Sequence, residues 1–328
     1  MTRTLLVFAA LIPFLAGCAS VGVVRDDAPP TSIQDGTTFT DLASGEVLSA
    51  QVAFDRLAEH RHVYVGEHHG DPVSHRAQLL VLEGLRARGV SVVVGVEWLP
   101  ASVQLRLDSW VRGDVPREAL LETVAWRQHW GHDPTHYAPI FHWAREHGVP
   151  VRALGAPTGL ARRVGRVGLA GLSPAERSQL PPMTSADPAH RSFFEAMMAR
   201  VAHAHGGHGH GHGHGHGHGH GHGGGESMMD RYYAAQLLRD EFMAANVASA
   251  AQGNPEGVVV ILAGRGHVDY GLGIPQRAQS ALGVPYVVVL SSSERSELTG
   301  LTNTGDFGER PMGDLLLVPG GGAAASEP

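Results

Sequence analysis

Four polar side chains that follow or end apolar runs are the residues best suited to chemistry in this chain. Glu67 and His69 follow one such run, Glu97 ends a second, and His267 follows a third much further along the chain. Two carboxylates and two imidazoles can ligate a divalent metal ion, and they can equally transfer protons as a general acid and base. The residue types alone leave both uses open.

A second set of potential ligands lies in a stretch of almost only His and Gly, residues 203–225, which we predict to be a disordered insert. Neutral imidazoles on a flexible chain bind Ni²⁺, Zn²⁺, Cu²⁺ or Co²⁺, and protonation competes below about pH 6.5. We expect the insert to offer many weak sites that concentrate metal or haem near the four polar side chains. The alternative is that the insert is a neutral low-complexity expansion without a function. The strictly alternating ligands are His208, His210, His212, His214, His216, His218, His220 and His222.

The composition excludes several classes of chemistry. All 25 basic side chains are arginine, so neither a Schiff-base lysine nor a phosphate-binding loop with its lysine is present. Cys18 is the single cysteine, which rules out an intrachain disulfide and a thiolate metal site. The net charge of -7 argues against a nucleic-acid partner.

The N-terminus predicts a lipid anchor. Arg3 precedes an apolar stretch that ends in the run Leu15-Ala16-Gly17-Cys18, and this stretch is shorter than the ~20 residues of a membrane span. We therefore expect residues 1–17 to be a signal peptide and Cys18 to carry lipid that attaches the chain to a membrane. The expected location is the cell envelope, and because Ala19 and Ser20 next to Cys18 are not acidic, it is the outer membrane in a Gram-negative cell.

The body of the chain, residues 37–293, alternates short apolar runs with helical patterns. Residues 18–36 read as a tether and residues 294–328 as a flexible tail. Continuous apolar runs are typical of strands covered on both faces, so we predict an α/β fold with a mainly parallel sheet flanked by helices. The expected strands are His62–Gly66, Val92–Glu97, Val151–Gly155, Val258–Gly264 and Tyr286–Leu290. The expected helices are Val73–Arg88, Ser102–Arg112, Tyr137–His147, Thr158–Val167, Ala189–Ala204, Ser227–Ala251 and Gln276–Leu282.

This arrangement brings the polar residues together. The carboxyl ends of parallel strands meet at one edge of the sheet, where α/β proteins bind their ligands. We therefore expect Glu67, His69, Glu97 and His267 to converge there.

These residues resemble a known family. Gly66-Glu67-His68-His69, Glu97 and the run Gly264-Arg265-Gly266-His267-Val268-Asp269-Tyr270-Gly271-Leu272-Gly273-Ile274-Pro275 look like the ChaN family, within the erythromycin-esterase-like and Tiki superfamily. The resemblance covers roughly residues 40–290. It implies an envelope lipoprotein that binds haem for iron uptake or storage, and a homodimer that encloses the haem.

The resemblance also implies roles for individual residues. Tyr270, Tyr137 and His267 are the expected haem-binding residues, with Tyr233 as a further tyrosine, since haem iron accepts His or Tyr as an axial ligand. The wider superfamily places a metal-dependent active site on Gly66–His69, Glu97 and Gly264–His267. A metal-dependent hydrolase with Glu67 or Glu97 as its base is thus the alternative function, and a purely structural envelope protein is a third.

Overall fold

The computed structural model describes residues 36–184, 187–206, 226–293, 301, 307 and 310–320. The predicted signal peptide, the lipidation site Cys18 and nearly all of the tether lie outside the described residues. So do residues 207–225, which include the eight alternating histidines. Among the residues that the structure describes, no helix is long and apolar enough to cross a membrane.

One eight-stranded sheet organises the fold, in the order β2-β1-β8-β7-β3-β6-β4-β5. The six strands from β8 to β5 run parallel, and β1 pairs antiparallel with both β8 and β2. The α/β, mainly parallel fold class is therefore confirmed. The strands are β1 Thr38–Asp41, β2 Val47–Leu48, β3 His62–Glu67, β4 Val92–Pro100, β5 Val151–Gly155, β6 Val258–Gly264, β7 Tyr286–Ser291 and β8 Leu315–Val318.

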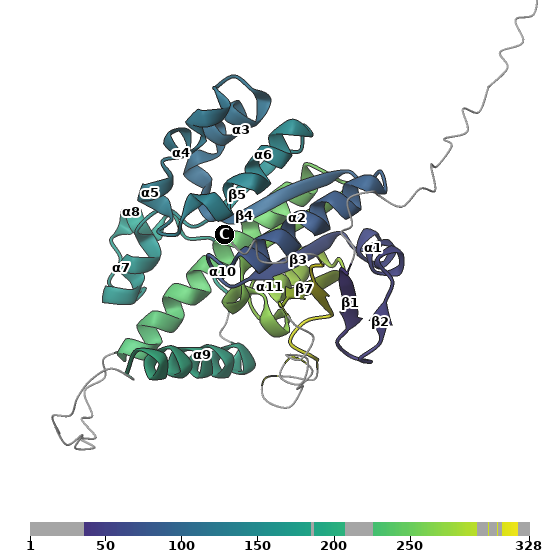
Figure 1. Ribbon diagram of the computed structural model, residues 1–328. Coiled ribbons are helices and arrows are strands. Elements are labelled where there is room, and N and C mark those ends of the chain that lie inside the picture. Colours follow the sequence, from purple (N-terminus) through teal and green to yellow (C-terminus); the bar gives the residue numbers. More distant parts are fainter. Residues whose placement is uncertain are drawn as a thin grey trace, which may run out of the picture.

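Helices cover both faces of the sheet (Figure 1). One face packs against α1, α2, α3 and α6, and the other against α10 and α11, while α7 and α9 lie against α10. The helices are α1 Ala50–Ala58, α2 Pro72–Ala87, α3 Gln104–Arg112, α4 Leu120–Thr123, α5 Trp126–His129, α6 Ala138–Glu146, α7 Leu160–Val167, α8 Pro174–Arg177, α9 Pro188–Gly206, α10 Met228–Gln252 and α11 Ile274–Leu282. Turns of 3-10 helix occur at Ala101–Val103, Arg117–Ala119, Pro134–His136, Arg265–His267 and Asp269–Gly271.

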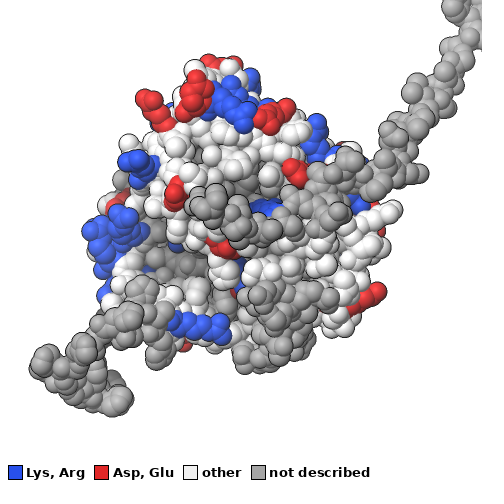
Figure 2. Space-filling model, viewed as in Figure 1, with Lys and Arg blue, Asp and Glu red and all other residues white. Residues whose placement is uncertain are grey.

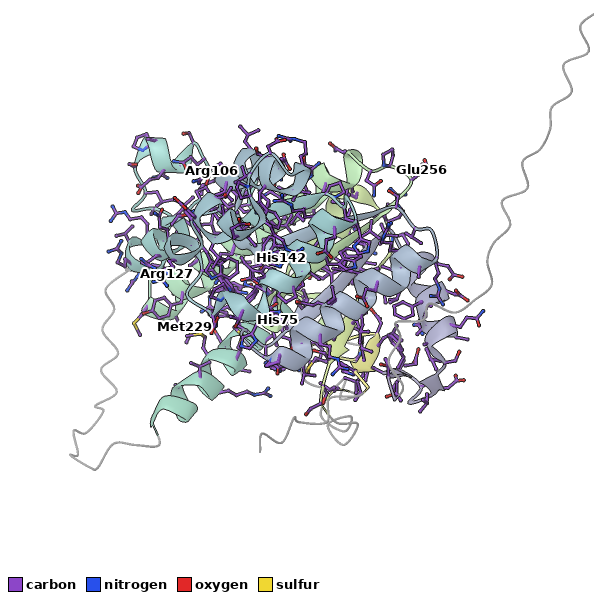
Figure 3. The ribbon with its side chains drawn as sticks, turned by 45° about the horizontal axis from the view of Figure 1, so that its top comes forward. His75, Arg106, Arg127, His142, Met229 and Glu256 are labelled. Atoms are coloured by element: carbon purple, nitrogen blue, oxygen red, sulfur yellow. The ribbon has the colours of Figure 1, made fainter. Side chains whose placement is uncertain are left out.

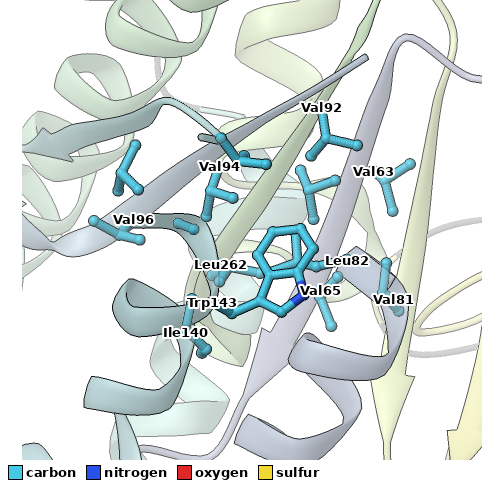
Figure 4. Packing of buried hydrophobic residues seen from close by; sticks show 14 of the residues in the cluster. Val63, Val65, Val81, Leu82, Val92, Val94, Val96, Ile140, Trp143 and Leu262 are labelled. Carbon is cyan, nitrogen blue, oxygen red and sulfur yellow. The ribbon is translucent and has the colours of Figure 1, made fainter. Parts of the chain in front are cut away.

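The apolar runs form strands because both of their faces are buried. Val63 and Val65 of β3 point into the cluster beneath α2, where they lie with Val94 and Val96 of β4 (Figure 4). Tyr64 points to the opposite face and packs in the cluster beneath α10. Successive side chains of a strand alternate between faces, so each central strand contributes to two cores.

All five predicted strands and all seven predicted helices are present, and the differences lie at the edges. The sequence-based assignment missed β1, β2 and β8, which are short and lie in polar or Gly-rich surroundings. Residues 294–328 were expected to be a flexible tail, yet Leu315–Val318 form β8, buried between β1 and β7. Residues 203–206, expected to belong to the disordered insert, are instead the last residues of α9.

Candidate functional site

Glu67 and His69 form an oriented pair at the carboxyl end of β3. The Glu67 carboxylate is fully buried and accepts a hydrogen bond from His69 Nδ1 at 2.7 Å. Trp98 Nε1 donates to the same oxygen at 3.2 Å, and Gln78 Nε2 donates to the other at 2.8 Å. His69 is 32% exposed, so Glu67 fixes an imidazole that solvent can still reach. His75, labelled in Figure 3, lies near the start of α2 on the far side of this carboxylate.

Glu97 and His267 belong to a second, deeper chain of charges. His267 Nδ1 lies 2.6 Å from Asp240 Oδ1 on α10, and His267 Nε2 lies 3.3 Å from Glu97 Oε1. Arg239 Nη2 donates to the same Glu97 oxygen at 2.5 Å. The second oxygen of Asp240 lies 3.4 Å from His190 Nε2. These contacts link β4, the 3-10 turn after β6, and α9 through α10.

The side chains of this chain of charges stabilise one another's ionised forms. Burial would raise the pKa of Glu97, but His267 and Arg239 outweigh it and hold that pKa well below its ordinary value. Burial would lower the pKa of His267, but the carboxylates of Glu97 and Asp240 outweigh it and raise that pKa to about 9. His267 is therefore a buried imidazolium between two carboxylates at neutral pH.

Gly264 lies between the Glu67–His69 pair and Glu97 of the chain of charges. Its amide donates to Glu97 Oε2 at 2.7 Å. A Cβ at this position would come within 2.6 Å of the His69 ring and 3.4 Å of Glu97, so only glycine allows both side chains to lie here. The structure therefore brings Glu67, His69, Glu97 and His267 together at one edge of the sheet, as predicted.

These four residues are paired with one another rather than arranged around an ion. Among the residues that the structure describes, no three or more His, Cys, Asp or Glu side chains are placed to hold a metal. The carboxylate oxygens of Glu67 and Glu97 already accept hydrogen bonds from side chains and backbone. The predicted shared metal site is not supported by this geometry.

The predicted haem-binding residues all contact other side chains or backbone groups of the protein. Tyr270 is buried, with its ring 5.7 Å from Phe193 and 5.4 Å from Phe307. The Tyr137 hydroxyl lies 3.5 Å from Glu67 and accepts from the Gly70 amide, and burial together with Glu67 raises its pKa well above the ordinary value. Both ring nitrogens of His267 are engaged. Iron ligation would require each of these groups to leave its present partners, and the haem-binding role of Tyr270, Tyr137 and His267 stays a prediction.

An open groove beside this cluster was not predicted. It lies between α7, α9 and α10 and has a volume of about 390 Å³, within the range of small-molecule sites. Figure 2 shows blue arginine side chains gathered over α7 beside a hollow in the surface. We call it the arginine groove; its lining residues are Ala161, Arg162, Gly165, Arg166, Phe194, Met198, Tyr232, Ala235, Gln236 and Arg239.

The groove has an apolar floor and a charged wall. Phe194 belongs to a small apolar cluster with Tyr233 and Leu237, and Met198 packs against it, as does Met229, labelled in Figure 3. Arg239 connects the groove to the buried chain of charges, because it lines the groove and donates to Glu97.

Several functional residues escaped sequence reasoning, although one signal could have revealed some of them. Gln236, Arg239 and Asp240 occur three and four residues apart, which places them on one face of a helix that is otherwise rich in apolar residues. Polar residues on a face that must be buried indicate a buried network. Gln78 and Trp98 carried no comparable signal.

Comparison with known proteins identifies the family. Residues 53–278 match the family described as "Haem-binding uptake, Tiki superfamily, ChaN". The structure is similar to that of Campylobacter jejuni ChaN, solved in a study of cofacial haem binding, with a TM-score of 0.62 and 15% identity over 87% of this chain and 97% of that one. An erythromycin esterase in its open conformation gives a TM-score of 0.43 at 12% identity, over 77% of this chain and 76% of that one.

A curated relative is much longer than this chain. The Arabidopsis thaliana protein RETICULATA-RELATED 5, chloroplastic, is 25% identical over 308 residues, which cover 90% of this chain. The match spans only 38% of that protein's length. The family match extends over more than two-thirds of the sequence and includes both the edge of the sheet and the groove. The chain belongs to the ChaN family of the Tiki superfamily.

Proposed function

We propose that this protein binds haem and that the arginine groove is where it does so. The observation that carries the proposal is the combination, in one open site of about 390 Å³, of an apolar floor with three guanidinium groups. Haem presents the matching surfaces, since its ring is flat and apolar and its two propionates are anionic. Arginine pairs with carboxylates through two parallel hydrogen bonds, which fixes orientation as well as charge.

Tyr232 is the residue we propose as the iron ligand. It lines the groove and is 40% exposed, unlike the buried Tyr137, Tyr233 and Tyr270. A tyrosine phenolate is an established axial ligand of haem iron. When bound, haem would supply the iron; the chain's own residues hold the ring and its carboxylates and limit its contact with water.

We further propose that the protein acts in the cell envelope as a lipoprotein anchored through Cys18, for haem uptake or storage. The run Leu15-Ala16-Gly17-Cys18 supports this part. The alternating His–Gly insert would add capacity for haem or for a transition metal. A homodimer enclosing haem is proposed by analogy with the cofacial binding of the Campylobacter protein.

Hemin titration of residues 19–328, purified without metal affinity, tests the proposal. We expect a shift of the Soret band that survives replacement of the eight alternating histidines by serine. Tyr232→Phe should alter the charge-transfer bands and weaken binding by no more than about threefold, because the ring stays and only the ligating oxygen is lost. Tyr286→Phe, whose hydroxyl contacts Arg310 away from the groove, is the matched control.

Loss of the Soret shift in the histidine-to-serine variant would instead assign haem to the insert. An unchanged spectrum in Tyr232→Phe would remove Tyr232 as the ligand.

Hydrolysis is a second candidate because of one observation. Glu67 orients His69 through Nδ1 while the imidazole stays partly exposed, which is the arrangement of a general base. Turnover of an activated ester that disappears in His69→Ala would favour this function, and no turnover by the wild-type protein would dismiss it.

A further inference from the structure

Two arginines of α7 face the groove without an ionic partner. Arg162 and Arg166 lie one helical turn apart and are both exposed, and neither makes an ion pair or hydrogen bond within the part of the chain that the structure describes. Like charges at this spacing repel and destabilise a helix. Arg163, on another face of α7, does have a partner, because its Nε lies 3.5 Å from Glu176 Oε1. The groove-facing pair thus carries a cost that the described chain does not offset, and a dianionic ligand would offset it.

The rest of the lining narrows the class of ligand. No acidic, histidine or cysteine side chain lines the groove among the described residues. Besides the arginines, its walls are mainly Phe194, Met198 and Tyr232, which offer an apolar surface to a flat body. The groove therefore has three arginines that can bind carboxylates. Only Tyr232 and the weakly ligating Met198 of its described lining can bind iron.

We propose that the arginine groove selects its ligand by two carboxylates on a flat apolar ring, whatever metal that ring holds. This inference rests on the proposed function of the groove as the haem site and extends it to a class, the porphyrin dicarboxylic acids. Metal-free protoporphyrin and its complexes with other metals would bind as haem does. The energy of binding comes from charge-assisted hydrogen bonds to Arg162 and Arg166 and from burial of the ring.

Three probes and one pair of variants test this class. Hemin, metal-free protoporphyrin IX and protoporphyrin IX dimethyl ester are titrated into the chain with serine in place of the eight alternating histidines, followed by absorption or porphyrin fluorescence. We expect the two acids to have dissociation constants within about threefold of each other, and the ester to bind at least tenfold more weakly.

The double variant Arg162→Gln/Arg166→Gln should weaken both acids by about 10- to 100-fold and leave the weak binding of the ester unchanged. Arg163→Gln is the matched control on the same helix and should alter neither. Arg162 and Arg166 are exposed and Arg163 is half-exposed, so the thermal unfolding of both variants should stay close to that of the parent.

The outcomes separate this inference from the proposed function. If hemin binds and protoporphyrin binds more than about threefold more weakly, the iron contributes to selection, which overturns the inference and keeps the haem site. An ester that binds as well as the acids would also overturn it. If none of the three probes binds, the proposed function of the groove fails as well.

Discussion

Two neighbouring regions use the same kinds of side chain in opposite ways. In the carboxyl-edge cluster, Glu67, Glu97, Asp240 and His267 are buried, and the charges are paired within the chain. In the arginine groove, Arg162 and Arg166 of α7 are exposed and have no ion pair or hydrogen bond within the described residues. Charges that are already paired in the fold mainly hold it together, whereas charges left unpaired beside an apolar floor are available to a ligand. The residues that look most reactive in the sequence are thus the less available of the two sets.

Arg239 joins the two regions. Its guanidinium lines the groove and also donates to the buried carboxylate of Glu97, and its side chain is 37% exposed. A ligand carboxylate in the groove would compete with Glu97 for this group. Variants in the cluster, in the groove and at Arg239 can therefore each test this contrast.

The largest effect is expected from removing a charge inside the cluster. Asp240→Ala takes away the carboxylate 2.6 Å from the His267 imidazolium and leaves a buried charge with one partner fewer. We expect the free energy of unfolding to fall by about 3–5 kcal/mol, measured by urea denaturation.

Asp55→Ala provides the comparison for an exposed pair. Arg88 Nε lies 2.8 Å from Asp55 Oδ1, whose side chain is 57% exposed, so the loss should stay below about 1 kcal/mol. Equal losses in the two variants would mean that the cluster does not stabilise the fold through its buried charges.

The pH dependence of stability is the next largest effect. The pKa of His267 is raised from 6.5 to about 9 in the folded protein. The folded state therefore binds this proton more tightly than the unfolded state, and the stabilisation is complete below pH 6.5 and disappears as the pH rises through 9. We expect the free energy of unfolding to decrease across this window, by up to ~3 kcal/mol.

His267→Gln should flatten that alkaline decrease. The pKa shift of His62 has the opposite sign, because burial lowers this pKa from 6.5 to about 4. Its contribution to the free energy of unfolding is therefore lost as the pH falls below 6.5. His62→Gln should therefore change only the acid side of the profile. An alkaline slope that survives in His267→Gln would assign it to another group.

At the junction of the two regions we expect a smaller stability effect than inside the cluster. Arg239→Gln removes one donor from Glu97 and one guanidinium from the groove. We expect a loss of about 1–2 kcal/mol in unfolding free energy together with about tenfold weaker hemin binding in the same preparation. Arg239→Lys should recover part of both, because it restores the charge without the planar fork. A change in one quantity without the other would show that the regions are independent.

Much of the fold was predictable because it depends on local patterns. The continuous apolar runs of β3, β4, β6 and β7 and the amphipathic segments between them indicated a parallel sheet with helices on both faces. The short edge strands were not predictable, since β8 pairs with β1 across almost the whole length of the chain. A four-residue strand in a Gly-rich tail has no local signal that distinguishes it from a loop.

The candidate site was predictable in its position and only partly in its composition. Strand ends in a parallel sheet must meet, so the convergence of Glu67, Glu97 and His267 followed from the topology. Their partners did not follow. Asp240 reaches His267 from α10, and Gln78 reaches Glu67 from α2, and both contacts depend on how these helices pack against the sheet.

The sequence by itself determined the parallel α/β architecture, the edge at which its polar residues gather and the family to which the chain belongs, because periodicity and short motifs are local properties. The tertiary structure alone decided which charges are paired and which remain free. Arg162, Phe194 and Tyr232 stand on three separate helices, and only the packing of α7 and α9 against α10 brings them together as one groove. The pairing of side chains is a property of neighbouring elements, and neither spacing nor composition records which elements become neighbours.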